Sequence, residues 1–270
     1  MPHPLSLAHL SLIASPPEDL IRTAALAGFD LVDLRLSPAT PTDRVYDDKE
    51  RISLCRALLP LLQGNGLAVW DVEIIRLGGD TDPERHLPLM EAASLLGARR
   101  LKVVCDSHDP AQAATLLAQL AELAAPFGLT LDLEYMIFSG VKSLGAALAV
   151  TRAAAQPNLQ VLVDALHWMR AGDSVAGIRA APAGSLGYVQ LCDGPLQAPS
   201  GRDALIREAR TDRRAPGDGE FPLKDLLDVM PEGCVASVEV PLRPGDDPLM
   251  HARHLHEAAR RITDLGENAS

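Results

Sequence analysis

The sequence is poor in aromatic residues and has no closely spaced cysteines. Phe, Trp and Tyr together make up 3% of the 270 residues. The four cysteines lie far apart, with no Cys-x-x-Cys pair, at Cys55, Cys105, Cys192 and Cys234. This spacing argues against a disulfide framework and against a zinc site built from cysteine pairs. We therefore expect reduced, buried thiols in a cytoplasmic protein.

Long apolar runs and an excess of positive charge are also absent. No apolar run reaches the roughly 18–20 residues that a membrane helix needs. The N-terminal stretch MPHPLSLAHLSL has no basic lead followed by a small-residue cleavage site, so we predict no signal peptide. A formal net charge of −11 argues against non-specific binding to nucleic acid. The expected partner is a small-molecule substrate, with no nucleic acid and no membrane.

What the sequence does contain is a repeat of short apolar segments, most of them preceded by glycine. There are about eight, in the ranges 5–12, 29–36, 67–77, 98–106, 129–136, 159–167, 188–193 and 234–241. Helical patterns fill the gaps, and the repeat length of roughly thirty residues is that of a βα unit. Eight such units without a linker predict a single (β/α)8 TIM barrel over 1–264, with a flexible tail at 265–270. A doubly wound open sheet is the alternative, weakened by the missing G-x-G-x-x-G.

Oxygen-bearing side chains stand at the ends of the last four predicted strands. They are Glu134, Asp164, Gln190 and Glu239, and in a parallel barrel they meet at one rim. Converging carboxylates repel unless a cation joins them. An oxygen-rich set suits Mg²⁺ or Mn²⁺ best, with Co²⁺ or Zn²⁺ as further candidates. Asp193, just before Gly194-Pro195, is interpreted as a turn former instead.

The sequence also resembles the xylose-isomerase-like barrels, a family that includes sugar isomerases and ketose 3-epimerases. The resemblance spans most of the chain and is strongest in LEYMIFSGVKSL, VLVDALHWMRAG, YVQLCDGP, EARTDRRAPGDGEFPLKDLLDVMP and SVEVP. It implies Glu134, Asp164, Gln190 and Glu239 as metal ligands, although a His is commoner in the epimerases where Gln190 stands. It also implies that His167 contacts substrate, and by analogy a homodimer or homotetramer.

The resemblance implies proton transfer beside a carbonyl. A divalent metal would stabilise an enediolate, while Glu134 and Glu239 act on opposite faces of the reacting carbon. The preferred hypothesis is therefore a metal-dependent isomerase or epimerase of a sugar or keto-polyol. The alternative is a metal-dependent lyase of the 3-dehydroshikimate dehydratase type, because those relatives also carry Gln at the third ligand position. The stretch LEYMIFSGV favours the isomerase. A nuclease and a metal-free binding barrel rank lower.

Further polar residues are assigned to substrate. Arg210 is expected to hold substrate oxygens, and the arginine-rich segment 201–220 could form a lid through Arg210 or Arg214. Arg35, Glu73 and Lys102, on the second, third and fourth strands, are weaker substrate-binding candidates. For Lys102 the alternative is that it neutralises acids inside the barrel. The histidines of 251–256 are interpreted as a solvated helix face.

Overall fold

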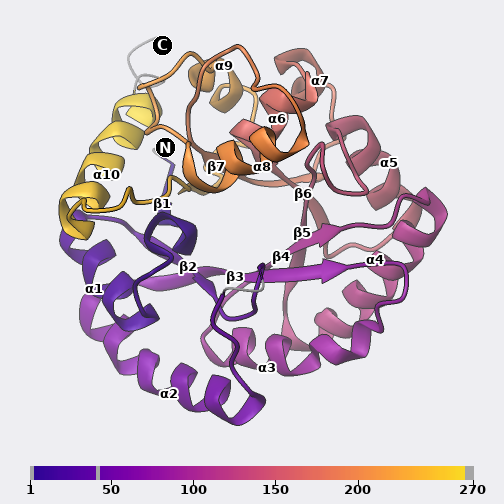
Figure 1. Ribbon diagram of the computed structural model, residues 1–270. Coiled ribbons are helices and arrows are strands. Elements are labelled where there is room, and N and C mark those ends of the chain that lie inside the picture. Colours follow the sequence, from indigo (N-terminus) through magenta and orange to yellow (C-terminus); the bar gives the residue numbers. More distant parts are fainter. Residues whose placement is uncertain (1–2, 41–42, 265–270) are drawn as a thin grey trace.

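The chain folds into a closed barrel of eight parallel strands, with helices around the outside (Figure 1). The computed structural model describes residues 3–40 and 43–264. Neighbours around the barrel follow chain order, and the last strand closes on the first. The strands are β1 (Leu5–Leu7), β2 (Leu31–Arg35), β3 (Ala68–Leu77), β4 (Arg100–Cys105), β5 (Thr130–Glu134), β6 (Leu159–Asp164), β7 (Leu186–Leu191) and β8 (Ala236–Val238). The predicted (β/α)8 barrel is confirmed, and the open sheet is excluded.

Helices connect the strands and form the outer layer. The longer ones are α1 (Pro17–Ala27), α2 (Asp48–Asn65), α3 (Leu87–Leu95), α4 (Pro110–Ala124), α5 (Leu144–Ala154), α8 (Arg202–Thr211) and α10 (Pro248–Asp264). Shorter ones are α6 (Ala165–Ala171), α7 (Val175–Arg179), α9 (Leu223–Leu227) and the 3₁₀ turns η1 (His9–Leu12), η2 (Pro83–His86) and η3 (Ala125–Phe127). Among the residues with a described position, no helix is long and apolar enough to cross a membrane. The tail predicted at 265–270 lies outside the described residues.

Local sequence signals set the helix ends. Asp47 and Glu50 form a reciprocal capping box at the start of α2, which satisfies amide groups that the first turn leaves free. Gly28 and Gly66 follow α1 and α2 with φ of 95° and 67°, a left-handed conformation that glycine adopts without steric cost. The turn to the next strand therefore begins at the glycine, as the repeat predicts. Apolar residues of the strands and helices pack into one large core between the two layers.

The inside of the barrel is polar at its amino end, away from the predicted site. Asp33 on β2 is fully buried and accepts hydrogen bonds from two serine hydroxyls. Ser6 lies on β1 and Ser237 on β8, the two strands that pair to close the barrel. Despite these bonds, burial raises the pKa of Asp33 to about 6. Asp132 on β5 forms an ion pair with Arg100 at 2.9 Å, and burial raises its pKa to about 6 as well.

The raised pKa of Asp33 predicts that folding stability depends on pH. The folded state holds this proton more tightly than the unfolded chain does. Protonation of Asp33 therefore contributes fully to the free energy of unfolding below about pH 4. This contribution, on the order of 3 kcal/mol, is lost as the pH rises to about 6 and above. We expect Asp33→Asn to reduce the fall of the unfolding free energy across this window, as measured by urea denaturation at several pH values. Equal pH slopes for the variant, the wild type and the exposed-site control Asp203→Asn would contradict this.

Candidate active site

The four predicted ligands lie at the carboxyl-end rim of the barrel. Glu134 and Asp164 end β5 and β6, Gln190 is the penultimate residue of β7, and Glu239 directly follows β8. Asp164 stands opposite Gln190 in the strand register, so neighbouring strands present these groups at the same level. All four side chains are buried. The placement at one rim follows from the parallel arrangement, as predicted.

These side chains converge on one small region. Gln190 Nε2 donates to Glu239 Oε1 at 3.2 Å. Glu134, Asp164 and His167 bring one ligand atom each within 4.8 Å of one another. Asp164 also accepts from the backbone N–H of His167 at 3.0 Å, which caps α6 and fixes His167 beside the rim. The sequence assigned His167 to substrate, and its imidazole is close enough to the carboxylates to act as either a ligand or a substrate contact.

Arg213 is a site residue that the sequence interpretation missed. Its guanidinium is buried and forms ion pairs with Asp164 at 2.6 Å and with Glu239 at 3.1 Å. Its Nε also donates to the carbonyl of Ala209 at 2.7 Å. Arg210, the residue predicted instead, lines the mouth of the same pocket and is exposed. Arg213 therefore supplies the fixed positive charge between the two carboxylates, while Arg210 stands where an entering substrate passes.

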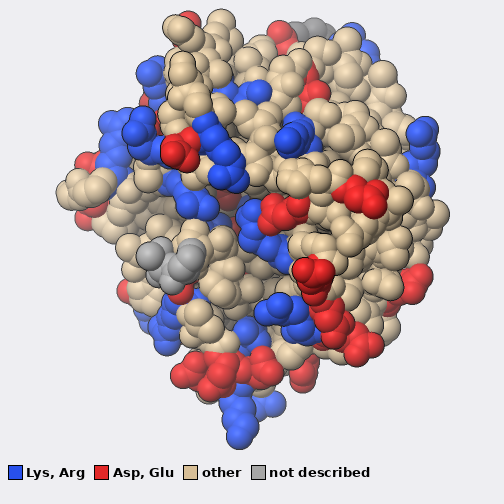
Figure 2. Space-filling view, turned by 45° about the vertical axis from the view of Figure 1, so that its right-hand side comes forward, with Lys and Arg blue, Asp and Glu red and all other residues tan. Residues whose placement is uncertain are grey.

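A chain of buried charges continues from Glu239 across the barrel. Lys102 Nζ lies 3.0 Å from Glu239 and 3.4 Å from Glu73, and Arg35 pairs with Glu73 at 2.6 Å. These contacts give Lys102 the neutralising position that was the alternative to substrate binding. Arg35, Lys102, Arg213 and Glu239 also line the pocket, so they stay within reach of a ligand. In Figure 2, Lys and Arg side chains gather near the centre of the face on view, although the chain is acidic overall.

The two glutamates differ sharply in their surroundings. Burial raises the pKa of Glu134 to about 7; the charges of Glu239 and Asp164 act in the same direction, and the more distant charges of Lys102 and Arg213 oppose it only in part. Burial also acts to raise the pKa of Glu239, but Lys102, Arg213 and Arg35 lower it to about 2. Among the described residues, no Lys or Arg lies within ion-pair distance of Glu134, and His167 Nε2 lies 4.0 Å from it. Burial lowers the pKa of His167 to about 4, so its imidazole is neutral at pH 7.

The donor set fits a hard divalent cation. Gln190 Oε1 is buried and has no hydrogen-bond partner among the described residues, which is costly for an amide oxygen. It lies beside Glu239, and the carboxylates of Glu134 and Asp164 complete an oxygen-rich group at the same rim. Such oxygens are the ligands that Mg²⁺ and Mn²⁺ prefer, and an imidazole also suits Zn²⁺. Glu134, Asp164, Gln190 and Glu239, with His167 beside them, are the residues that would hold the ion.

The pocket above these groups has a volume of about 210 Å³. Ile74, Met136 and Phe138 form an apolar wall on one side, and Arg76 and Arg210 stand at the mouth. Phe138 packs edge-on against the His167 ring, with centroids 5.5 Å apart. Trp168, which follows His167, is buried in the hydrophobic core. The size and the mixed lining suit a small, oxygenated substrate.

Asp193 holds the loop that carries Arg213. Its carboxylate accepts from the backbone N–H groups of Gly194, Gly217 and Phe221 at 2.8–2.9 Å. A Cβ at Gly219 would collide with this carboxylate, so the loop can pass here only with glycine at that position. The predicted role of Asp193 as a turn former is confirmed, and it extends to the whole 213–221 loop.

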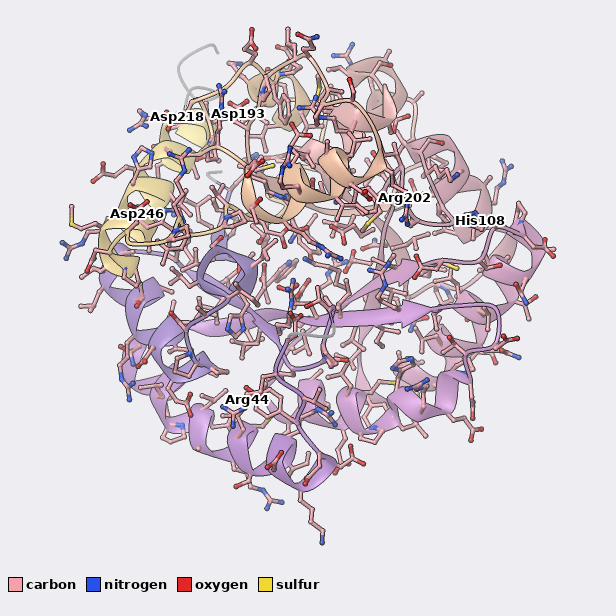
Figure 3. The ribbon with its side chains drawn as sticks, in the orientation of Figure 1. Arg44, His108, Asp193, Arg202, Asp218 and Asp246 are labelled. Carbon is pink, nitrogen blue, oxygen red and sulfur yellow. The ribbon has the colours of Figure 1, made fainter. Side chains whose placement is uncertain are left out.

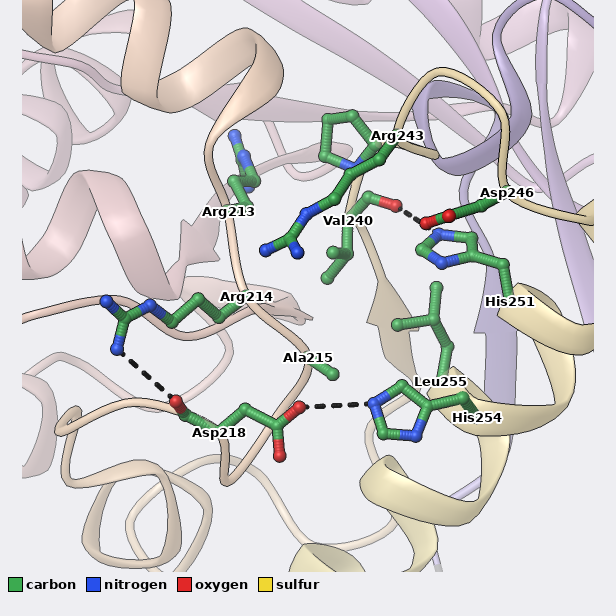
Figure 4. Close-up of a pocket in the computed structure, with 11 residues that line it drawn as sticks. Arg213, Arg214, Ala215, Asp218, Val240, Arg243, Asp246, His251, His254 and Leu255 are labelled. Carbon is green, nitrogen blue, oxygen red and sulfur yellow. Dashed lines mark hydrogen bonds and ion pairs between the residues drawn. The ribbon is translucent and has the colours of Figure 1, made fainter.

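Arg214 lines a second pocket, beside α10, where its guanidinium donates to the carbonyl of Asp218 at 3.4 Å (Figure 4). There His254 pairs with Asp218 at 3.1 Å, and His251 donates from Nε2 to the carbonyl of Val240 at 2.8 Å. His254 is exposed and His251 is half-buried. The predicted solvated face therefore describes His254, whereas His251 ties α10 to the end of β8.

The chain belongs to the xylose isomerase-like TIM barrel family, whose model matches residues 21–262. It is 31% identical over 230 residues to a 3-dehydroshikimate dehydratase of Pseudomonas aeruginosa, a match that covers 82% of this chain and 35% of the relative. It is 30% identical over 116 residues to a putative hydroxypyruvate isomerase of Streptomyces coelicolor, covering 43% of this chain and 36% of the relative. The chain thus spans about a third of the length of these curated relatives.

Solved structures share the fold. The IOLI protein, whose structure contains a bound zinc atom, superimposes with a TM-score of 0.79. The match covers 98% of this chain and 99% of that protein, at 16% sequence identity. At that identity the similarity establishes the architecture only.

Proposed function

We propose that this protein is a divalent-metal-dependent lyase that removes water from a cyclic hydroxy-keto acid of the 3-dehydroshikimate type. The observation that carries the proposal is the unequal setting of the two glutamates. Glu134 has no cationic side chain within ion-pair distance among the described residues, whereas Glu239 is held by Lys102 and Arg213. The dehydratase relative, matched over 82% of this chain, supports the same reaction. The sequence alone ranks the isomerase first; we place the lyase first on the support of these two findings.

A single competent base suits elimination better than inversion at carbon. Epimerisation by two carboxylates needs both to bind and release a proton, and the ion pairs of Glu239 oppose protonation. Elimination needs a proton to be taken from carbon and a proton to be given to the departing hydroxyl. Glu134 is the candidate for both steps: it takes the proton from carbon and, once protonated, gives it to the hydroxyl, which the neutral His167, 4.0 Å from Glu134, can hold by a hydrogen bond. The proton removed and the hydroxide lost add up to one water.

The remaining residues position the substrate. Arg213 and Lys102 fix Glu239, Arg210 can bind a carboxylate at the pocket mouth, and Phe138 offers an apolar face to a ring. A divalent ion at Glu134, Asp164, Gln190 and Glu239 would supply Lewis-acid polarisation of the substrate carbonyl. The proposed partners are a small-molecule substrate and, by analogy with the family, a second copy of the chain.

The second candidate is an isomerase or epimerase of a sugar or keto-polyol. The specific observation in its favour is the match to the putative hydroxypyruvate isomerase. The same base beside a carbonyl can start either reaction, and the outcome then depends on whether a hydroxyl leaves. Removal of a proton from the carbon next to the carbonyl is therefore common to both candidates.

Ultraviolet absorbance separates the two reactions. We expect 3-dehydroshikimate to develop the new absorbance of a conjugated product when mixed with the protein and Mn²⁺ or Mg²⁺. A chelator should remove this activity, and the ion should restore it. Exchange of a substrate C–H for deuterium from D₂O, in a ketose or α-hydroxy ketone without loss of water, would favour the isomerase instead. Neither reaction in the metal-loaded protein would contradict both candidates.

A further inference from the structure

A third pocket lies next to the active-site pocket and shares Phe138 with it. It has a volume of about 310 Å³ and is formed by the loops after β4 and β5 together with the start of α8. Phe138 lines both pockets: its ring packs on His167, and its carbonyl faces Arg202 Nη2 at 3.5 Å. One residue thus separates the two spaces.

The charge of this pocket is of one sign. The described residues that line it include His108, Lys142 and Arg202 and no carboxylate. Among the described residues His108 and Lys142 have no hydrogen-bond or ion-pair partner, and the side chain of Arg202 has only the long contact to the Phe138 carbonyl. His108 and Arg202 lie near each other on one side of the barrel (Figure 3). In a chain with a net charge of −11, three basic groups without an acid are unusual.

The acidic residue next to His108 does not compensate this charge. Asp109 accepts from the backbone N–H of Ala111 at 2.9 Å and thereby caps α4. An anion that enters the pocket would therefore meet basic side chains and no lining carboxylate. The floor adds a second requirement, because Ile137, Phe138 and Leu205 present apolar side chains beside the basic groups. A ligand with an anionic head and an apolar body matches both features.

We propose that this pocket is a binding site for a small organic carboxylate, separate from the catalytic pocket. The carboxylate head lies among Lys142, Arg202 and His108, and the apolar body lies on Phe138 and Leu205. Carboxylates and basic side chains form charge-assisted hydrogen bonds, and the apolar contact favours an organic acid over a bare inorganic anion. The site does not depend on which reaction the catalytic pocket performs.

Isothermal titration calorimetry of the full chain with benzoate tests the site. At low ionic strength we expect saturable binding of one benzoate per chain, and no binding of benzyl alcohol, which has the ring without the charge. Lys142→Gln and Arg202→Gln should each weaken the affinity about threefold and the double variant about tenfold, as partly exposed ion pairs do. Salt near 0.5 M should also weaken the affinity. The charges are exposed to the solvent, and at this salt concentration the Debye length falls to roughly 4 Å, so their attraction for the carboxylate is screened.

Two matched variants distinguish this site from its alternatives. Arg210→Gln removes a charge at the mouth of the catalytic pocket, and Arg253→Gln removes an exposed charge on α10. We expect Arg253→Gln to bind benzoate like the wild type, and Arg210→Gln to keep the binding that depends on Lys142 and Arg202, because Arg210 does not line this pocket. Weakening by Arg210→Gln but not by Lys142→Gln would place benzoate in the catalytic pocket and overturn the proposal. Equal weakening by Arg253→Gln, tighter binding of inorganic phosphate than of benzoate, or no saturable binding would also overturn it.

Discussion

Glu134→Gln is expected to lower kcat by about 10²–10⁴-fold, the range that a positioned general base contributes. The amide keeps the shape of the side chain and removes its ability to accept the proton. Because burial raises the pKa of Glu134 to about 7, the folded state gains little from its charge, so the variant should fold normally. Steady-state kinetics on the substrate identified by the absorbance assay, together with urea denaturation, measure both effects.

The control for Glu134 is Asp132→Asn on the same strand. Asp132 lies two residues earlier, toward the amino end of the barrel, and pairs with Arg100 there. Its substitution also removes a buried carboxylate, but away from the pocket. We expect this variant to lose stability and to keep kcat within about threefold, because Asp132 does not line the pocket and acts on the reacting atoms only from a distance. If Glu134→Gln kept wild-type turnover with the metal bound, Glu134 would not be the base.

Strand-end residues were predictable because their position depends on local pattern alone. An apolar run that ends at Glu134, and another that ends at Asp164, place these carboxylates at one rim as soon as the strands are parallel. For Glu239 the strand ends one residue earlier, at Val238, which leaves the carboxylate at the same level. The alternation of helix and strand, with glycine after the helices, likewise depends on short-range sequence.

Arg213 was not predictable for the opposite reason. The segment 201–220 carries several arginines in a polar context, and nothing local distinguishes the buried one from Arg210 or Arg214. Its burial results from the path of the 213–221 loop, which Asp193 fixes by accepting from the backbone N–H groups of Gly217 and Phe221. The sequence contains one related signal: Asp193 follows a strand, and Gly217 and Gly219 come later in the chain. That these residues are in contact becomes known only from the tertiary structure.

Removing the guanidinium of Arg213 should reveal how strongly the carboxylates repel. Arg213→Gln leaves Asp164 and Glu239 buried without their shared cation, and breaking a buried ion pair in this way costs about 3–5 kcal/mol. We expect a corresponding loss of unfolding free energy in metal-free buffer. Because the same carboxylates are proposed ligands, Mn²⁺ should raise the Tm of this variant by more than it raises that of the wild type. Thermal denaturation with and without Mn²⁺ provides the comparison.

Arg170→Gln is the matched control for the metal effect. Arg170 also forms a buried ion pair, with Glu208 at 2.6 Å, but it contacts none of the proposed ligands. Its loss should destabilise the chain by a similar amount, while Mn²⁺ should raise its Tm no more than that of the wild type. A Tm gain equal in the two variants would mean that Mn²⁺ binds elsewhere. A Tm gain larger than that of the wild type in Arg213→Gln alone would mean that Asp164 and Glu239 share one cation site, which Arg213 partly neutralises when no metal is bound.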